Sequence, residues 1–154
     1  SRLILHRDVK EKFTTMLKER ASKIRLGAGT DPNTEVGPII NERQLQRVNK
    51  YLDIAREEGA TVLIGGEIAR EGELQHGYFF EPTILDNVTP QMRVAREEIF
   101  GPVVALIEIS NFEEAINILN DSNYGLSSSI YTRDINRAFA AMRDIEAGIT
   151  YING

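Results

Sequence analysis

The sequence predicts an α/β fold in which a mostly parallel β-sheet is flanked by helices. Short apolar runs alternate along the chain with longer stretches in which apolar residues recur at the 3.6-residue period of a helix. Strands that alternate with helices are joined by crossovers, and crossovers make neighbouring strands parallel. No repeat, linker or composition shift interrupts the 154 residues, so we expect a single domain over residues 1–154.

The first elements are set by caps and by periodicity. A strand over residues 3–5 precedes a helix that starts at Asp8, where Glu11 completes a capping box. After the turn-rich residues 27–38, a second helix over 42–58 ends before Gly59, a residue suited to the left-handed conformation that often follows a helix. A buried strand over 61–64 comes next. The residues expected to point inward are Val9, Phe13, Met16, Leu17 and Ala21 in the first helix, and Leu45, Val48, Leu52 and Ala55 in the second.

The alternation continues through the rest of the chain. A polar loop over 67–77 leads to a strand over 78–85, and Thr89 with Pro90 predicts the start of a short helix over 91–96. The later elements are a strand over 103–109, a helix capped by Asn111 and Glu114, a strand over 127–131, a helix over 134–145 and a strand over 149–152. Their helices should bury Phe112, Ala115, Ile116 and Leu119, and then Ile135, Ala138, Phe139, Met142 and Ile145.

Composition excludes several classes of partner. The formal net charge of −5 provides no basic face, which argues against nucleic acid or an anionic membrane surface. No apolar run reaches the ~18 residues of a membrane span, and no basic-then-apolar leader precedes Leu3, so we expect a cytoplasmic protein. His6 and His76 lack a second ligand at metal spacing, so no metal site is expected. The chain contains no cysteine, which excludes disulfides and thiolate chemistry within it.

The stretch Glu97-Glu98-Ile99-Phe100-Gly101-Pro102 is the strongest functional signal. It places two carboxylates, an aromatic ring and a Gly-Pro bend directly before an apolar strand, a position where α/β enzymes hold ligands. The acid pair alone would favour a solvated helix end by roughly 70%, because charged side chains are mostly exposed. The whole hexapeptide instead favours a ligand role for Glu98 and for Phe100, and leaves Glu97 as structural or merely solvated.

Together with Gly37-Pro38-Ile39-Ile40 upstream and Ala147-Gly148 followed by Asn153 downstream, the hexapeptide resembles the aldehyde dehydrogenase superfamily of nicotinamide-dependent oxidoreductases. The resemblance covers essentially all of the chain, in order. It corresponds to the later part of the family's catalytic domain, beginning just after the catalytic cysteine. The fold implied is an aldehyde dehydrogenase catalytic-domain-like fragment.

The resemblance implies NAD or NADP as cofactor and assigns roles to five residues. Glu98 would accept hydrogen bonds from the hydroxyls of the nicotinamide ribose, and Phe100 would pack beside the nicotinamide ring. Gln44 and Arg47 match positions where some members contact the ribose or phosphate region, although a solvated polar face is favoured by about two to one. Asn153 matches a residue of the substrate tunnel, and a strand-end hydrogen bond explains it equally well.

The implied parent enzyme oxidises an aldehyde to a carboxylic acid through a cysteine thiolate. Because this chain has no cysteine, no catalytic residue is assigned to it and the isolated chain is expected to be inactive. The implied partners are a small-molecule aldehyde, an upstream cofactor-binding domain of the same parent chain and further copies in a homo-oligomer. Two alternatives stay open: a non-catalytic binding or assembly module that retains the fold, and an acylating or acyl-phosphate-reducing member of the same superfamily.

Overall fold

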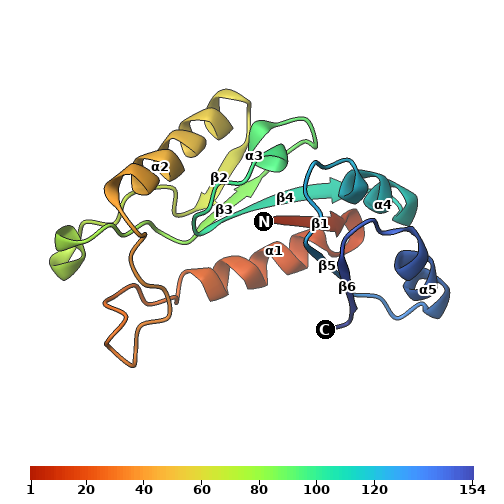
Figure 1. The fold of residues 1–154 in the computed structure, drawn as a ribbon, viewed down its shortest axis with the longest axis horizontal. Coiled ribbons are helices and arrows are strands. Elements are labelled where there is room, and N and C mark those ends of the chain that lie inside the picture. The colour runs from red at the N-terminus through yellow and green to blue at the C-terminus, as the bar shows by residue number, and fades with distance from the viewer. The chain divides into compact units, whose positions relative to one another are not determined.

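A computed structural model describes residues 1–154 and divides into two units, residues 1–108 and residues 109–154. The first unit contains the four-stranded sheet and the loop at residues 97–102, and the second contains a pair of strands (Figure 1). The single domain over residues 1–154 stays a prediction.

The first unit is built on a four-stranded sheet with the order β1-β4-β3-β2. Its strands are β1 (Arg2–His6), β2 (Thr61–Ile64), β3 (Thr83–Asp86) and β4 (Val103–Ile109). β3 pairs in parallel with β4, β2 pairs antiparallel with β3, and the arrows of β1 and β4 point the same way in Figure 1. The predicted α/β class with a mostly parallel sheet is therefore confirmed.

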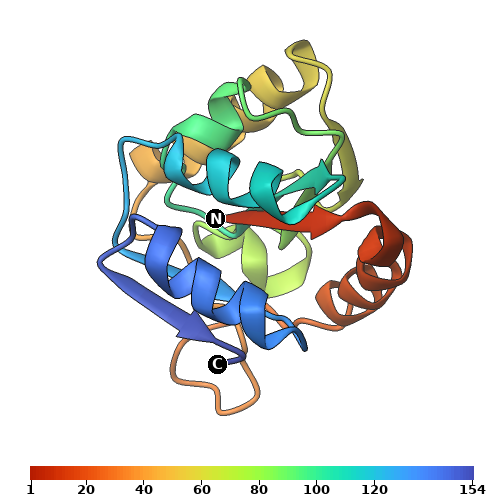
Figure 2. The ribbon, with the colours of Figure 1, turned by 90° about the vertical axis from the view of Figure 1, so that its right-hand side faces the viewer.

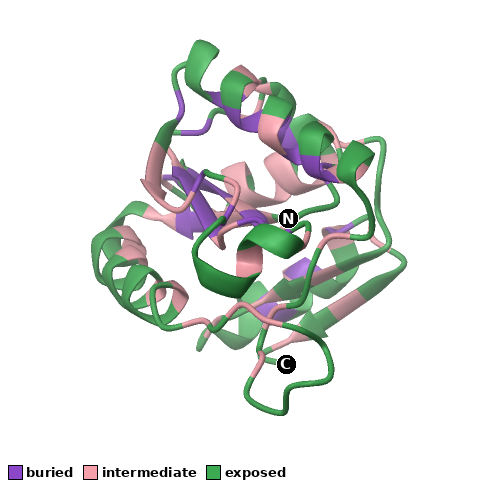
Figure 3. Ribbon diagram, turned by 90° about the vertical axis from the view of Figure 1, so that its left-hand side faces the viewer, coloured by how far each residue is buried: buried purple, intermediate pink, exposed green.

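Helix α2 (Glu42–Glu57) packs against β2 and buries one of its faces, as predicted. Its inward residues Leu45, Val48, Leu52 and Ala55 are buried, and Tyr51 is buried beside them. Figure 3 shows the buried residues as a purple stripe along this helix, at the top of the view. Gly59 follows α2 with a φ of 95°, the left-handed conformation predicted for it.

Helix α1 (Arg7–Ala21) corrects two predictions. It begins at Arg7, and its cap is His6, whose Nδ1 accepts a hydrogen bond from the Asp8 amide at 3.3 Å; the predicted box of Asp8 and Glu11 does not cap the helix. No residue of α1 is buried. Leu17 and Ala21 pack against the core, whereas the other three residues predicted to point inward, Val9, Phe13 and Met16, are exposed.

Three further predictions between residues 61 and 96 were wrong, two in extent and one in burial. The strand expected over 78–85 is confined to β3, because Pro82 lacks an amide donor and Phe80 forms only an isolated bridge with Ile68. The polar loop contains a 3₁₀ turn, η1 (Gly72–His76), and the short helix α3 spans only Arg93–Arg96. The strand β2 is half-buried at most of its positions, not fully buried.

The second unit consists of α4 (Phe112–Asn120), β5 (Ser127–Ile130), α5 (Ile135–Asp144) and β6 (Ile149–Ile152). β5 and β6 are parallel, and α4 lies beside α5 (Figure 2). Asn111 caps α4 as predicted, by accepting from the Glu114 amide at 2.8 Å. The predicted inward stripes of the two helices are corrected. α4 buries no residue fully. α5 buries Ala138 and Ala141, and Ile145 directly after the helix is also buried, whereas Ile135, Phe139 and Met142 are exposed.

The two α5 residues that are buried within the helix are small, which fits close packing of α5 on α4. Periodicity predicts that a helix has an apolar side. The larger residues on that side of α5 are exposed, because only the small residues among them are buried. None of the helices has the length and apolar character that a membrane crossing requires.

Candidate functional site

The hexapeptide forms a tight loop between α3 and β4. Phe100 adopts a φ of 55°, a left-handed conformation that is uncommon for residues other than glycine. The residue is 74% exposed. The next residue, Gly101, lies so close to α2 that a Cβ atom there would come within 2.5 Å of Val48 Cγ2. The Pro102 carbonyl accepts a hydrogen bond from the Thr83 amide at 2.8 Å. The loop is thus packed on both sides while the aromatic ring faces outward.

Gln44 and Arg47 hold the backbone of this loop from α2. Gln44 Nε2 donates to the carbonyls of Ile99 at 2.8 Å and Phe100 at 3.0 Å. Arg47 Nη2 donates to the Glu98 carbonyl at 2.8 Å. The polar face predicted for these two residues therefore serves the loop, and direct contact of either side chain with a cofactor stays a prediction.

Glu97 is the best-anchored side chain of the loop. Tyr51 donates from its hydroxyl to Glu97 Oε2 at 2.6 Å. Arg93 donates from Nε to Oε1 at 2.8 Å and from Nη2 to Oε2 at 3.1 Å. These bonds, the Arg93 bonds first, lower the pKa of Glu97 to about 2. The same Glu97 bond raises the pKa of Tyr51. Of the two sequence interpretations of Glu97, the structural one holds.

The guanidinium groups of Arg47 and Arg93 also lie near the Tyr51 ring, 5.6 Å and 5.8 Å from its centroid. Tyr51 and Arg93 were not singled out from the sequence. A signal was available for both: Gln44, Arg47 and Tyr51 share one helical face, and Arg93 precedes Glu97 by four residues.

Glu98 contrasts with its neighbour. It is exposed, and the hydrogen bond from Arg47 goes to its backbone carbonyl. Its carboxylate interacts through charge with the N-terminal ammonium of Ser1, and its acceptor oxygens remain available for hydrogen bonds to a donor from outside the chain. An acceptor-only group beside the exposed ring of Phe100 suits a ligand with hydroxyl donors next to a flat apolar part. The structure thus brings together Gln44, Arg47, Glu98 and Phe100.

Asn153 lies in the second unit, where it closes the ends of β5 and β6. Its Oδ1 accepts from the Thr132 amide at 2.9 Å, and its Nδ2 donates to the Thr132 carbonyl at 3.0 Å. It has a φ of 56°. These bonds match the strand-end interpretation of Asn153, and its place in a substrate tunnel stays a prediction.

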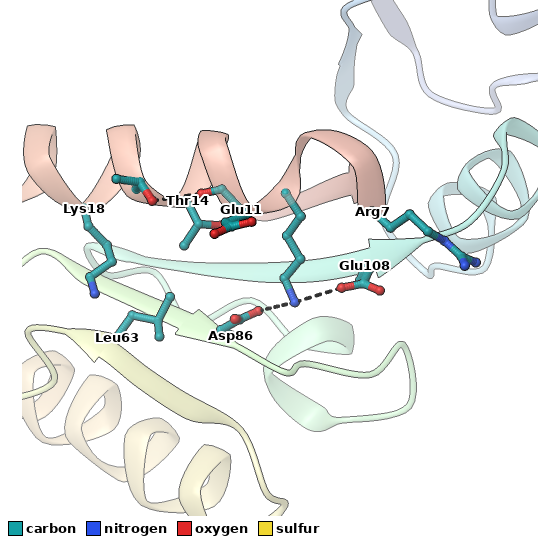
Figure 4. Close-up of a pocket in the computed structure, with 9 residues that line it drawn as sticks. Arg7, Glu11, Thr14, Lys18, Leu63, Asp86 and Glu108 are labelled. Carbon is teal, nitrogen blue, oxygen red and sulfur yellow. Dashed lines mark hydrogen bonds and ion pairs between the residues drawn. The ribbon is translucent and has the colours of Figure 1, made fainter.

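A separate hollow of about 380 Å³ lies beside α1, and none of the sequence-predicted site residues lines it. Lys10 Nζ lies there between Asp86 Oδ1 at 2.9 Å and Glu108 Oε2 at 3.1 Å (Figure 4). Burial disfavours the charged form of Lys10, but the bonds and charges of the two carboxylates outweigh it and raise its pKa. This cluster is an internally matched ion-pair site. No group of three or more His, Asp or Glu side chains is arranged to hold a metal ion.

The mostly parallel sheet and the helices packed on it define an α/β protein, in which the charged, ring-bearing loop directly precedes a central strand. The model of the aldehyde dehydrogenase family matches residues 1–154, and the chain belongs to that family. The resemblance carried by the hexapeptide is therefore confirmed.

Two relatives and one solved structure illustrate the match. The chain is 42% identical over 153 residues to alpha-ketoglutaric semialdehyde dehydrogenase of Bacillus subtilis, covering 99% of this chain and 31% of the relative. It is 40% identical to betaine aldehyde dehydrogenase of Brucella anthropi, with the same coverage. A crystal structure of betaine aldehyde dehydrogenase from Staphylococcus aureus in complex with NAD+ matches with a TM-score of 0.96 at 38% identity, covering 99% of this chain and 30% of that chain. The chain thus spans about 31% of the length of these curated relatives.

Proposed function

We propose that this chain is a segment of an NAD(P)-dependent aldehyde dehydrogenase, in which it positions the nicotinamide ribose and lines part of the substrate tunnel. The parent enzyme oxidises an aldehyde to a carboxylic acid. The observation that carries the proposal is the loop at residues 97–102, which presents the free carboxylate of Glu98 beside the exposed ring of Phe100. Family membership and the NAD+ complex of the Staphylococcus aureus relative support it.

The chemistry of the loop fits a nicotinamide riboside. Glu98 offers two acceptor oxygens to two neighbouring ribose hydroxyls, and hydrogen bonds to a carboxylate are among the stronger kind. Phe100 offers a flat apolar surface to the ring attached to that ribose. Gln44 and Arg47 fix the backbone between these two side chains. The bound cofactor supplies the hydride acceptor, and the contribution of this segment is orientation.

The remaining parts of the proposed enzyme lie outside this chain. We place the thiolate nucleophile and the dinucleotide-binding domain in an upstream part of a longer parent, which the 31% coverage of the relatives supports. The parent is proposed to be a cytoplasmic homo-oligomer. Since the chain has no cysteine, we expect the purified 154-residue chain to show no aldehyde-dependent NADH formation at any pH, measured by absorbance after removal of host dehydrogenases.

The test of the proposal is Glu98→Gln in the full-length enzyme that contains this segment. The substitution keeps the shape of the side chain but removes its charge and turns one acceptor into a donor. Hydrogen bonds to charged groups contribute about 1.5–3 kcal/mol, so the turnover rate should fall roughly ten- to hundredfold. Cofactor affinity should fall less, because other parts of the parent hold the adenine end.

Two measurements make this test specific. A deuterated aldehyde should show a larger isotope effect in Glu98→Gln, because hydride transfer becomes more rate-limiting. The matched control is Glu57→Gln, which alters an exposed acid near the far end of α2 and should leave both rate and isotope effect unchanged. A parental rate with an unchanged isotope effect in Glu98→Gln would refute the proposal.

A further inference from the structure

Two adjacent and chemically identical residues of the loop have opposite surroundings. Both carboxylate oxygens of Glu97 accept hydrogen bonds from within the chain, one from Arg93 alone and the other from Arg93 and Tyr51. The carboxylate of Glu98 is left for an outside donor. A surface acid that merely solvates a helix end would not need three donors from two different helices.

Glu97 stands where the backbone changes direction. It is the C-cap of α3, with φ of −113° and ψ of 150°, so the chain leaves the helix there in an extended conformation. In extended backbone, successive side chains point to opposite sides. Fixing the side chain of Glu97 on Tyr51 and Arg93 therefore turns Glu98 away from α2 and α3.

The other contacts of the loop do not replace this anchor. Gln44 and Arg47 bond to backbone carbonyls, which fixes where the loop lies. Ile99 is buried and is held by packing, whereas Glu97 is the polar side chain of the loop that hydrogen bonds fix, at the residue directly before Glu98. The low pKa of Glu97 keeps these bonds charge-assisted throughout the neutral range.

We propose that Glu97 is a positioning residue, whose bonds to Tyr51 and Arg93 set the direction in which Glu98 and Phe100 face the nicotinamide ribose. This inference rests on the proposed function of Glu98. Glu97 itself touches neither the cofactor nor the aldehyde, and it acts through its neighbour. Tyr51 is the second member of the same device, because its hydroxyl ties Glu97 to the helix that also carries Gln44 and Arg47.

The experiment is a double-mutant cycle between Glu97→Gln and Glu98→Gln in the full-length enzyme. We expect Glu97→Gln alone to lower the turnover rate about two- to tenfold, the range that loss of one hydrogen bond gives, and to raise the isotope effect. In the Glu98→Gln background the same change should cost less than about twofold, because the carboxylate that it positioned is gone.

Three further readouts keep the cycle informative. Tyr51→Phe retains the ring and should reproduce a smaller part of the Glu97→Gln effect even if the latter variant folds poorly. Asp53→Asn on the same helix removes an exposed ion pair with Arg56 at 3.2 Å and should change nothing. Without cofactor, amide hydrogen exchange of residues 98–103 should rise in Glu97→Gln and not in Asp53→Asn, as measured by mass spectrometry.

The outcomes separate the two proposals. If the effects of Glu97→Gln and Glu98→Gln simply multiply, Glu97 acts independently of Glu98 and the positioning role is overturned while the ribose contact stands. A parental rate in Glu97→Gln and Tyr51→Phe, with Glu98→Gln impaired, would overturn the positioning role as well. A parental rate in Glu98→Gln would overturn both proposals.

Discussion

Helices α1 and α2 are nearly equal in length, at 15 and 16 residues, yet they use their apolar residues differently. α2 buries five of its residues, and α1 buries none. Both show apolar residues at helical spacing in the sequence, so the pattern alone does not distinguish them. Periodicity predicts a helix and shows which residues form its apolar face. Whether other elements pack against that face and bury it depends on the rest of the fold.

The polar sides of the two helices differ in the same way. On α2, Gln44, Arg47 and Tyr51 all bond to the functional loop, at Ile99 and Phe100, at Glu98 and at Glu97 respectively. On α1, Lys10 is held between the acids Asp86 and Glu108 of the sheet. α2 therefore joins the core to the candidate site, whereas α1 closes an ion-pair cluster with no connection to the loop residues.

The comparison is tested most strongly by matched truncations on the two helices. Leu52 on α2 is fully buried, so Leu52→Ala should lower the free energy of unfolding by about 2–5 kcal/mol. Met16 on α1 is 61% exposed, so Met16→Ala should change it by about 0.5 kcal/mol or less. Urea unfolding of both variants measures the difference. Equal losses would mean that α1 is covered in solution and that the contrast is false.

The next expected effect is a loss of stability where the loop packs against α2. In Gly101→Ala the new methyl group would lie 2.5 Å from Val48 Cγ2, so overpacking should cost about 1–3 kcal/mol of unfolding free energy. Val48→Ala in the same chain should remove much of the added cost. Gly29→Ala is the control, because no atom lies within 4 Å of a Cβ there. A loss in Gly29→Ala as large as that in Gly101→Ala would contradict this account.

A smaller effect is expected at the helix caps. Asn41 Oδ1 accepts from the Gln44 amide at 2.9 Å, so Asn41→Ala should destabilise the chain by about 1 kcal/mol. His6 accepts from the Asp8 amide at the longer distance of 3.3 Å, and His6→Ala should cost less at neutral pH. Thermal unfolding midpoints of the two variants give the ranking. The reverse ranking would show that α1 depends on its cap more than α2 does.

What the sequence predicts well is local. The bounds of β4 and the inward face of α2 follow from an apolar run and a regular helical stripe, and the structure confirms both. The loop at 97–102 was found because its unusual residues are adjacent. The exposed faces of α1 and α5 could not be predicted, because a stripe such as Val9, Phe13 and Met16 carries no information on what packs against it.

In the candidate site, too, the adjacent residues of the motif could be predicted and the contacts between distant residues could not. Glu98 and Phe100 were identified from the motif, but the bonds of Gln44 to the loop join residues 55 and 56 positions apart. The bond from Tyr51 to Glu97 spans 46 positions. Such pairs are set by the packing of α2 beside the loop, and no local rule of capping or periodicity contains them. The local signals were the spacing of Arg93 and Glu97 and the helical face that Gln44, Arg47 and Tyr51 share, and neither says which residues of the loop that face contacts.

The smallest expected effect is the pH dependence contributed by Glu97 at the junction of α2 and the loop. Its folded pKa of about 2 lies below the value of about 4.3 expected for an unfolded glutamate. A lowered folded pKa adds stability that is fully present above the unfolded pKa and is lost as the pH falls toward the folded one. The difference in unfolding free energy between the wild type and Glu97→Gln should therefore be constant from about pH 5 to 7 and shrink between about pH 4.5 and 2. Because 39% of the Glu97 side chain is exposed, screening should limit this contribution to about 1 kcal/mol or less.

In a Tyr51→Phe background one of the donors that stabilise the Glu97 carboxylate is gone, so the pH-dependent part of the unfolding free energy should become smaller still. Urea titrations across this range measure it, and a difference that grows as the pH falls would show that the bonds to Tyr51 and Arg93 do not stabilise the charged form.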